Sequence, residues 1–219
     1  MKLVVFDVDG TLVDSQHHIH RGMDHAFVSV GLPAPTLAAV AATVGLSLPN
    51  AMAQLAPDAD GTVHAALADG YRQAFIASHV AEDAPLYPGA IACLDSLVAR
   101  NDLLLAVATG KGRRGLMAMI QHHGLQRHFV SMQTADDHPS KPDPSMLWGA
   151  LAETGVGAAD AVMIGDTSFD MQMARNAGIA GFGVNWGYHP AEALSAAGAA
   201  LVAPDFDALT CEIEDWAAR

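Results

Sequence analysis

The stretch Asp7-Val8-Asp9-Gly10-Thr11-Leu12-Val13-Asp14-Ser15, directly after the apolar run Leu3-Val4-Val5-Phe6, decides how this chain can fold. A short apolar run rich in β-branched residues predicts a buried strand. Asp7 then lies at the carboxyl end of that strand, and Asp9 points to the same side if the extended geometry continues. Two adjacent carboxylates repel each other unless a cation or a shared proton separates them. The stretch is therefore either a polar strand-to-turn junction or part of a charged site.

The composition is that of a folded protein. The chain has 219 residues, of which 51% are hydrophobic, enough for one good-sized domain or a domain with a smaller insert. Its formal net charge is −13 with only 11 Lys and Arg, which argues against nucleic acid and anionic membranes as partners. No apolar run reaches the length of a signal peptide or a membrane span, so a cytoplasmic setting is expected. Cys93 and Cys211 fit no metal-binding spacing, and we expect buried free thiols.

The segment 16–82 shows helical patterns and no candidate strand. Apolar residues recur at helical spacing in its first and last parts. Thr36 and Thr62 are candidate N-caps, because a hydroxyl can accept from the first free N–H groups of a helix. Helices are expected at 16–30, 37–44, 51–55 and 63 to about 80, with a turn at 45–50.

After Pro85 the pattern changes to alternating strands and helices. Strands are expected at 103–108, 129–132, 161–164, 182–184 and 200–202, and helices at 89–100, 113–122, 144–154, 168–177, 191–197 and 206–217. Such alternation with short apolar strands predicts an α/β fold, with a parallel sheet covered by helices on both faces. The first strand must join this sheet. The segment 16–82 is therefore an all-helical insertion into a core made of 1–15 and 83–219.

Polar residues follow several of the expected strands. Thr109-Gly110-Lys111 comes after the strand at 103–108, and Gly165-Asp166 after the strand at 161–164. Lys141 lies in the loop that follows the strand at 129–132. Ligands of open α/β sheets bind beyond the carboxyl ends of the strands, so these residues should meet Asp7 at one edge. Asp170, four residues after Asp166 at the start of a helix, should share its face.

These groups suit phosphoryl transfer. Asp7, Asp9 and Asp166 form a set of hard oxygen ligands, which favours Mg²⁺. One carboxylate can act as the nucleophile, and its neighbour two residues on can give and take the proton. Thr109, nearby backbone N–H groups and Lys141 can stabilise charge on the transferring group. The few cations of this acidic chain gather in the same regions, at Lys111, Arg113, Arg114 and Lys141.

The motifs resemble those of the haloacid-dehalogenase-like phosphohydrolases, specifically their phosphoglycolate-phosphatase-like members, over essentially the whole chain. The stretch from Asp7 to Ser15 is similar to the family's first motif, and Ala108-Thr109-Gly110-Lys111 to its second. Lys141-Pro142 looks like the third motif, and Gly165-Asp166-Thr167-Ser168-Phe169-Asp170 like the fourth. The first and fourth are specific signals, whereas a lone Thr or Lys is a weak one.

The resemblance implies a Rossmann-like three-layer core with an inserted helical cap, and it implies roles for single residues. Asp7 would be the nucleophile and Asp9 the general acid and base. Mg²⁺ would be held by Asp7, the main-chain carbonyl of Asp9 and Asp166, with Asp170 supporting the site. Thr109, Gly110, Lys111 and Lys141 would bind the phosphate. The segment 16–82 would be a cap that closes over the site and selects the substrate, with Gly45 and Ser47 at its specificity turn.

Alternatives from other functional classes remain. Gly110-Lys111-Gly112-Arg113-Arg114-Gly115 matches the dinucleotide fingerprint and would suit an NADP-dependent oxidoreductase. That fingerprint requires an acidic residue at the tip of the next strand, and Asp136 and Asp137 fall several residues past the end expected for it. A non-catalytic binding protein is a further alternative, although all the reacting residue types are present. His17, His18, His20 and His25 could suggest a metal site, but a solvated helix face explains them better.

The sequence leaves the substrate open within one class, small phosphate monoesters. Phosphoglycolate is the leading named candidate, and a β-phosphoglucomutase-like phosphotransferase, which uses similar motifs, is the main alternative. The carboxylate of phosphoglycolate calls for a cation or several N–H donors opposite the phosphate. Residues 22–71 contain no Lys or Arg, and only Arg21 and Arg72 flank this span. The sequence does not indicate an oligomeric state.

Overall fold

The computed structural model describes residues 1–77 and 84–219, and its centre is a six-stranded, all-parallel sheet. The strands are β1 (Lys2–Phe6), β2 (Leu103–Thr109), β3 (Ser131–Thr134), β4 (Ala161–Gly165), β5 (Ala180–Val184) and β6 (Leu201–Ala203), in the order β3-β2-β1-β4-β5-β6. β1 lies between β2 and β4, and Phe6 is in register with both Val107 and Ile164. The residues that follow these three strands therefore meet at the point where the strand order reverses, a common ligand site in such sheets.

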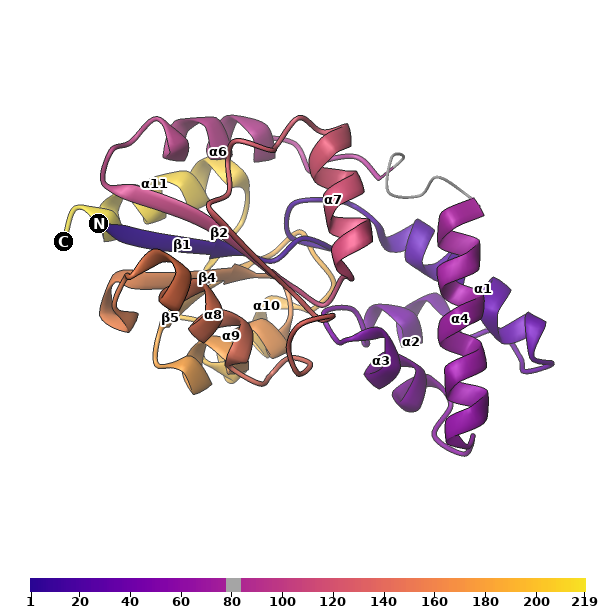
Figure 1. The fold of residues 1–219 in the computed structure, drawn as a ribbon. Coiled ribbons are helices and arrows are strands. Elements are labelled where there is room, and N and C mark those ends of the chain that lie inside the picture. Colours follow the sequence, from indigo (N-terminus) through magenta and orange to yellow (C-terminus); the bar gives the residue numbers. More distant parts are fainter. Residues whose placement is uncertain (78–83) are drawn as a thin grey trace.

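Helices cover both faces of the sheet, which confirms the three-layer α/β fold (Figure 1). Val4 and Phe6 of β1 pack into one apolar cluster, whereas Leu3 and Val5 pack into another, as the two-residue period of a strand requires. The first cluster includes side chains of α6 (Ala90–Val98), α7 (Arg113–His122) and α11 (Phe206–Ala217). The second includes those of α8 (Ser145–Thr154) and α9 (Ser168–Ala177). The remaining helix of this part of the chain, α10 (Ala191–Ala197), packs on α9, β5 and β6.

Residues 16–77 form only helices, as expected, and lie beyond the carboxyl ends of the strands (Figure 1). They are α1 (Gln16–Ser29), α2 (Leu37–Ala41), α3 (Leu48–Leu55) and α4 (Gly61–Ala77). Their buried side chains form a cluster of their own, which includes Ile19, Phe27, Met52 and Leu67. The two connections to the core run side by side, since Asp14 donates its N–H to the carbonyl of Pro85. The expected boundary at 82/83 lies outside the described residues, so the division into core and cap stays a prediction.

The sequence misplaced the third strand of the core by two residues. β3 begins at Ser131 rather than Phe129, because Ser131, Gln133 and Thr134 are the residues buried in the sheet, and the amide of Gln133 donates to Ser131 Oγ at 2.8 Å. Because the buried side chains of this strand are polar, its sequence lacks the apolar run by which a buried strand is predicted.

Some helix starts and one cysteine also differ from expectation. α3 begins at Leu48, not 51, because Pro49 is tolerated in its first turn. Asp60, not Thr62, caps α4 by accepting from two backbone N–H groups. The side chain of Thr36 does cap α2, as predicted, although that helix already ends at Ala41. Cys93 is buried but Cys211 is exposed, off the buried face of α11.

No helix in the described ranges combines the length and the apolar character that crossing a membrane requires.

Candidate active site

Three buried carboxylates gather where β1 and β4 end. One oxygen from each of Asp7, Asp166 and Asp170 lies within 4.8 Å of the others, and no other such group of possible metal ligands occurs among the described residues. Asp166 accepts from Thr11 Oγ1 at 2.7 Å and from the N–H of Tyr188 at 2.9 Å. No described group donates a hydrogen bond to either oxygen of Asp7. Unsatisfied buried oxygens beside another carboxylate fit a divalent cation with hard oxygen ligands.

Lys141 lies among these carboxylates and is fully buried. Its Nζ is 2.6 Å from Asp170 Oδ1, and it approaches Asp7 Oδ1 to 3.0 Å as an ion pair without hydrogen-bond geometry. The other oxygen of Asp170 accepts from the N–H and the hydroxyl of Thr167, in the capping box of α9. Both Asp170 oxygens are thus already engaged. Asp170 is therefore better placed to hold Lys141 than to coordinate a metal.

Burial sets the electrostatics of this cluster. It raises the pKa of Asp7 to about 7, against the opposing effect of the Lys141 ammonium. Burial also raises the pKa of Asp166 well above its usual range, and the charges of Asp170 and Asp7 add to the rise. Burial alone would lower the pKa of Lys141, but Asp170 and Asp7 raise it above the ordinary lysine value. A single ammonium does not balance three buried carboxylates, so a further cation would relieve their repulsion.

Asp9 stands apart from this cluster. Its Oδ1 accepts from Ser15 Oγ at 2.7 Å, and its Oδ2 lies 3.0 Å from Lys111 Nζ. The hydroxyl of Tyr188 is 3.1 Å from Ser15 Oγ and so extends this network. The side chain of Asp9 is therefore held by hydrogen bonds and an ion pair outside the three-carboxylate group. A metal role for Asp9 would rest on its main-chain carbonyl, and that role stays a prediction.

The expected phosphate-binding loop follows β2. Thr109 is buried, and its Oγ1 accepts from the backbone N–H of Lys111 at 3.2 Å. A Cβ added at Gly110 would come within 2.5 Å of the Gly45 carbonyl oxygen and 2.6 Å of that of Leu46, so the helical segment rests directly on this loop. The N–H of Ser47 donates to Ser140 Oγ at 2.8 Å, a second contact across the same boundary. The turn at 45–47 therefore touches the core beside the site.

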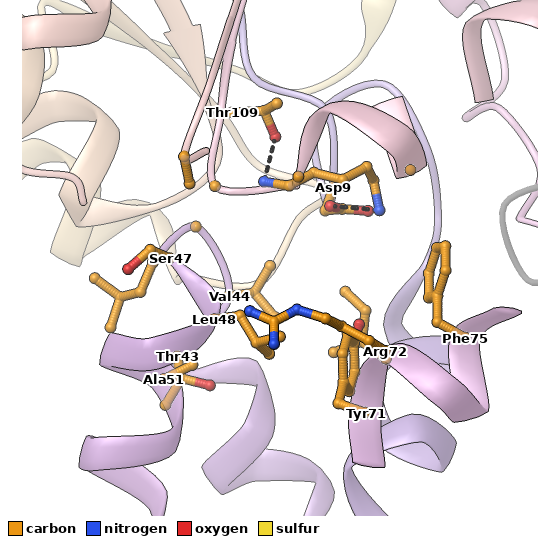
Figure 2. Close-up of a pocket in the computed structure, with 18 of the residues that line it drawn as sticks. Asp9, Thr43, Val44, Ser47, Leu48, Ala51, Tyr71, Arg72, Phe75 and Thr109 are labelled. Carbon is orange, nitrogen blue, oxygen red and sulfur yellow. Dashed lines mark hydrogen bonds and ion pairs between the residues drawn. The ribbon is translucent and has the colours of Figure 1, made fainter. Parts of the chain in front are cut away.

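A cavity of about 840 Å³ opens between this site and the helical segment (Figure 2). Its walls include most of the residues expected to act, namely Asp7, Asp9, Gly45, Ser47, Thr109, Gly110 and Lys111. Lys141, Asp166 and Asp170 are not part of the wall and lie buried beside it. The structure thus brings the expected residues into one place, in two layers. The cavity surface carries Asp7, Asp9 and the loop after β2, and the layer behind it carries the charges of Lys141, Asp166 and Asp170.

Several residues of the site were not anticipated. Thr11 and Tyr188 hold Asp166, and Gly10 and Gly187 give it room, since a Cβ at either glycine would come within 2.2 Å of its side chain. Thr11 lies in the first motif and could have been considered. Tyr188 and Gly187 follow β5 with no recognisable pattern, so only the tertiary structure shows their part. Helix α4 also contributes Tyr71, Arg72 and Phe75 to the cavity wall.

The structure changes one of the arguments against dinucleotide binding, the distance of the acidic residues from the third strand. Asp136 and Asp137 lie only two and three residues past the observed end of β3, so their distance from the strand does not argue against dinucleotide binding. Both are already used by the protein: Asp136 accepts from the N–H of Arg113 at 2.8 Å, and Asp137 pairs with its guanidinium at 2.6 Å. The contact of Gly110 with the turn at 45–47 also covers the loop that a pyrophosphate would need. Among the four histidines, His17 and His25 are exposed, as a solvated helix face predicts.

Comparisons with known proteins agree with this geometry. Residues 4–184 match the family model described as haloacid dehalogenase-like hydrolase. The chain is 36% identical over 210 residues to the probable phosphatase IndB of Dickeya dadantii, covering 93% of this chain and 90% of that protein. It is 29% identical over 217 residues to a phosphoglycolate phosphatase of Vibrio parahaemolyticus, covering 95% and 94%.

The fold comparison gives the same result. The crystal structure of a predicted phosphatase from Clostridium acetobutylicum superposes with a TM-score of 0.89 at 26% identity, covering 98% of each chain. The likeness therefore spans the helical segment as well as the sheet. With its acidic cluster at the end of β1 and a family match over most of its length, the chain belongs to the haloacid dehalogenase-like hydrolase family and is an enzyme related to phosphatases.

Proposed function

We propose that this phosphatase is Mg²⁺-dependent and hydrolyses a small phosphate monoester through an aspartyl-phosphate on Asp7. The observation that carries the proposal is the environment of the Asp7 carboxylate. It is buried at the end of β1, it borders the cavity, and no described group donates a hydrogen bond to it. Lys141 pairs with Oδ1 only, so the Oδ2 atom keeps its lone pairs for attack on phosphorus or for a metal.

Asp9 is the proposed proton donor and acceptor. As an Asp7 oxygen forms its bond to phosphorus, the bond from phosphorus to the leaving oxygen breaks, and Asp9 protonates that oxygen. Asp9 then takes a proton from water, the water oxygen attacks phosphorus, and Asp7 is released together with inorganic phosphate. Ser15 and Lys111 orient the Asp9 carboxylate for both steps. Thr109 and the Lys141 ammonium stabilise the negative charge on the transferring group.

The residues present fit a Mg²⁺ ion. Asp7 and Asp166 would hold it together with the main-chain carbonyl of Asp9, and Asp170 would support the site through Lys141. When bound, Mg²⁺ supplies positive charge that neutralises the carboxylates and the phosphate oxygens.

Phosphoglycolate is the first substrate to test, because relatives of similar length are named phosphoglycolate phosphatases. Its second negative group is the feature that distinguishes it from simple alkyl phosphates. The cavity borders both the phosphate loop and α4, so it has room for a substrate that reaches from one to the other.

The decisive experiment is hydrolysis of p-nitrophenyl phosphate by the wild-type protein and by Asp7→Asn. We expect turnover that requires Mg²⁺, is lost in EDTA, and falls to background in the variant, since the amide cannot attack phosphorus. Circular dichroism would check that the variant is folded. Undiminished turnover in folded Asp7→Asn would refute the mechanism. Phosphate transfer to glucose phosphate in preference to water would instead indicate a mutase-like phosphotransferase.

A further inference from the structure

The cavity wall contributed by the helical segment is mostly apolar, with the hydroxyls of Thr43, Ser47 and Tyr71 and, among the described residues, a single charged side chain. Its described side chains include Ile19, Met23, Val44 and Leu48, and among them Arg72 is the single charged residue. A negative group that enters such a wall loses its hydration, and that loss is costly unless a cation receives it. Arg72 is therefore the natural partner for any anionic part of a substrate on this side of the cavity.

Arg72 is held loosely and can be recruited. Figure 2 shows its side chain pointing from α4 into the pocket, beside Tyr71. Its guanidinium pairs with Asp69 at 2.7 Å, and the two side chains are 55% and 67% exposed. Exposed ion pairs of this kind contribute only about 0–1 kcal/mol. Exchanging Asp69 for a substrate carboxylate therefore costs little, and a guanidinium can bind a carboxylate through two parallel hydrogen bonds.

The other cations on the cavity wall are on the core side. Lys111 is committed to Asp9 at 3.0 Å and lies over the Phe75 ring, next to the phosphate loop. Arg114 lies in the first turn of α7 and is exposed. The cavity wall thus has Lys111 and Arg114 on the core side, where the phosphate loop lies, and Arg72 on the side of the helical segment. A substrate with a negative group at each end matches this distribution of charge.

We propose that Arg72 is a specificity-determining residue that binds a carboxylate carried by the phosphate monoester substrate. This inference rests on the proposed function and narrows its substrate class. Cavities of about 300–1,000 Å³ enclose drug-sized ligands, so the 840 Å³ here accommodates carboxylated phosphates larger than phosphoglycolate, including ones with a ring. Tyr71 and Phe75, whose ring centres are 6.1 Å apart, offer flat apolar surfaces to such a ring.

The test uses substrates that differ only in the carboxylate. We would measure kcat/KM for 4-carboxyphenyl phosphate against phenyl phosphate, and for phosphoglycolate against ethyl phosphate, in the wild type, Arg72→Gln and Arg72→Lys. We expect the wild type to prefer the carboxylated member of each pair by about 10- to 100-fold, the range of a charge-assisted hydrogen bond. Arg72→Gln should abolish the preference by lowering kcat/KM more for the carboxylated member of each pair than for the uncharged one, whereas Arg72→Lys should keep part of the preference.

Matched variants separate this role from others. Arg114→Gln removes the exposed cation that α7 contributes to the cavity wall and should keep the preference, and Asp69→Asn should keep or increase it. The inference is overturned if the wild type shows no preference, if Arg72→Gln retains it, or if Arg72→Gln lowers both members of a pair equally. Failure of the proposed function would look different, because Asp7→Asn would then still hydrolyse every substrate.

Discussion

Lys141 is the residue on which the buried charges depend. Its ammonium lies between Asp170, at 2.6 Å, and Asp7, at 3.0 Å, and all three side chains are buried. A buried ion pair often adds little net stability, because removing its charges from water is costly. Removing one partner has a larger effect, since the remaining charges are then both buried and unpaired.

We therefore expect Lys141→Met to lower the free energy of unfolding by about 3–5 kcal/mol, as for other broken buried ion pairs. Urea denaturation in EDTA would measure it, so that no added cation replaces the ammonium. Lys2→Met is a suitable control, because Lys2 forms a hydrogen bond to the Trp216 carbonyl without a buried carboxylate partner. A loss below about 1 kcal/mol in Lys141→Met would show that Asp7 and Asp170 do not depend on this charge.

At the level of single residues, the sequence predicted groups that follow strands and missed groups that arrive from elsewhere. Asp7, Thr109 and Asp166 were found because each ends an apolar run, and parallel strands bring their carboxyl ends together. In the sequence, Arg72 is distinguished only by its place at the end of a span without Lys or Arg, whereas the structure places it in the cavity wall. Its place depends on how α4 packs over the core, and a helical pattern does not say which side of the helix will face a cavity between the helical segment and the sheet.

At the level of elements, the turn at 45–47 and the loop after β2 form a close backbone contact between the helical segment and the core. Gly110 lies against the main-chain carbonyls of Gly45 and Leu46, so any side chain there meets rigid backbone. The same loop carries Thr109 and Lys111, which border the phosphate end of the cavity. Moving the turn would therefore change the shape of the site without touching a reacting group.

Gly110→Ala tests this contact. We expect kcat/KM for p-nitrophenyl phosphate to fall by about 10- to 100-fold, because displacements of about 1 Å can cost that much, with little change in the melting temperature. Gly112→Ala is the matched control in the same loop, since its Cβ would meet only the Asp136 carboxylate, at 3.2 Å, and that side chain can move. Equal effects of the two substitutions would show that the loop, and not its contact with the turn, is what matters.

The elements themselves could be predicted where side-chain pattern and burial agree. β1, β2 and β4 are apolar runs buried on both faces, and the structure has them within a residue or two of the expected bounds. β3 was misplaced because its buried side chains are polar, with Gln133 bonded to Ser131 and Thr134 to Asp137. The start of α3 was missed because proline normally interrupts a helix but is accepted in its first turn.

At the level of the whole molecule, an acidic chain concentrates its negative charge where it most needs a cation. Its 24 Asp and Glu exceed its 11 Lys and Arg, and three of the carboxylates are buried together at the switch point of the sheet. The fold places them there because β1 joins the sheet between β2 and β4. The resulting repulsion opposes folding, and relief of that repulsion by a bound cation should stabilise the entire protein.

Mg²⁺ should therefore raise the melting temperature of this protein in the absence of any substrate. At a concentration of about 100 times Kd, binding to the folded state contributes about 2.7 kcal/mol, which corresponds to roughly 5–10 °C for a chain of this size. Differential scanning fluorimetry in EDTA and in a Mg²⁺ series would measure the shift.

Asp166→Asn should melt at a higher temperature than the wild type in EDTA, because it removes one of the three repelling charges, and should lose most of the response to Mg²⁺. Asp58→Asn, which changes an exposed carboxylate, should respond like the wild type. An identical Mg²⁺ shift in Asp166→Asn would place the cation elsewhere, whereas loss of the shift in that variant alone ties the stability of the whole fold to the cluster beside Asp7.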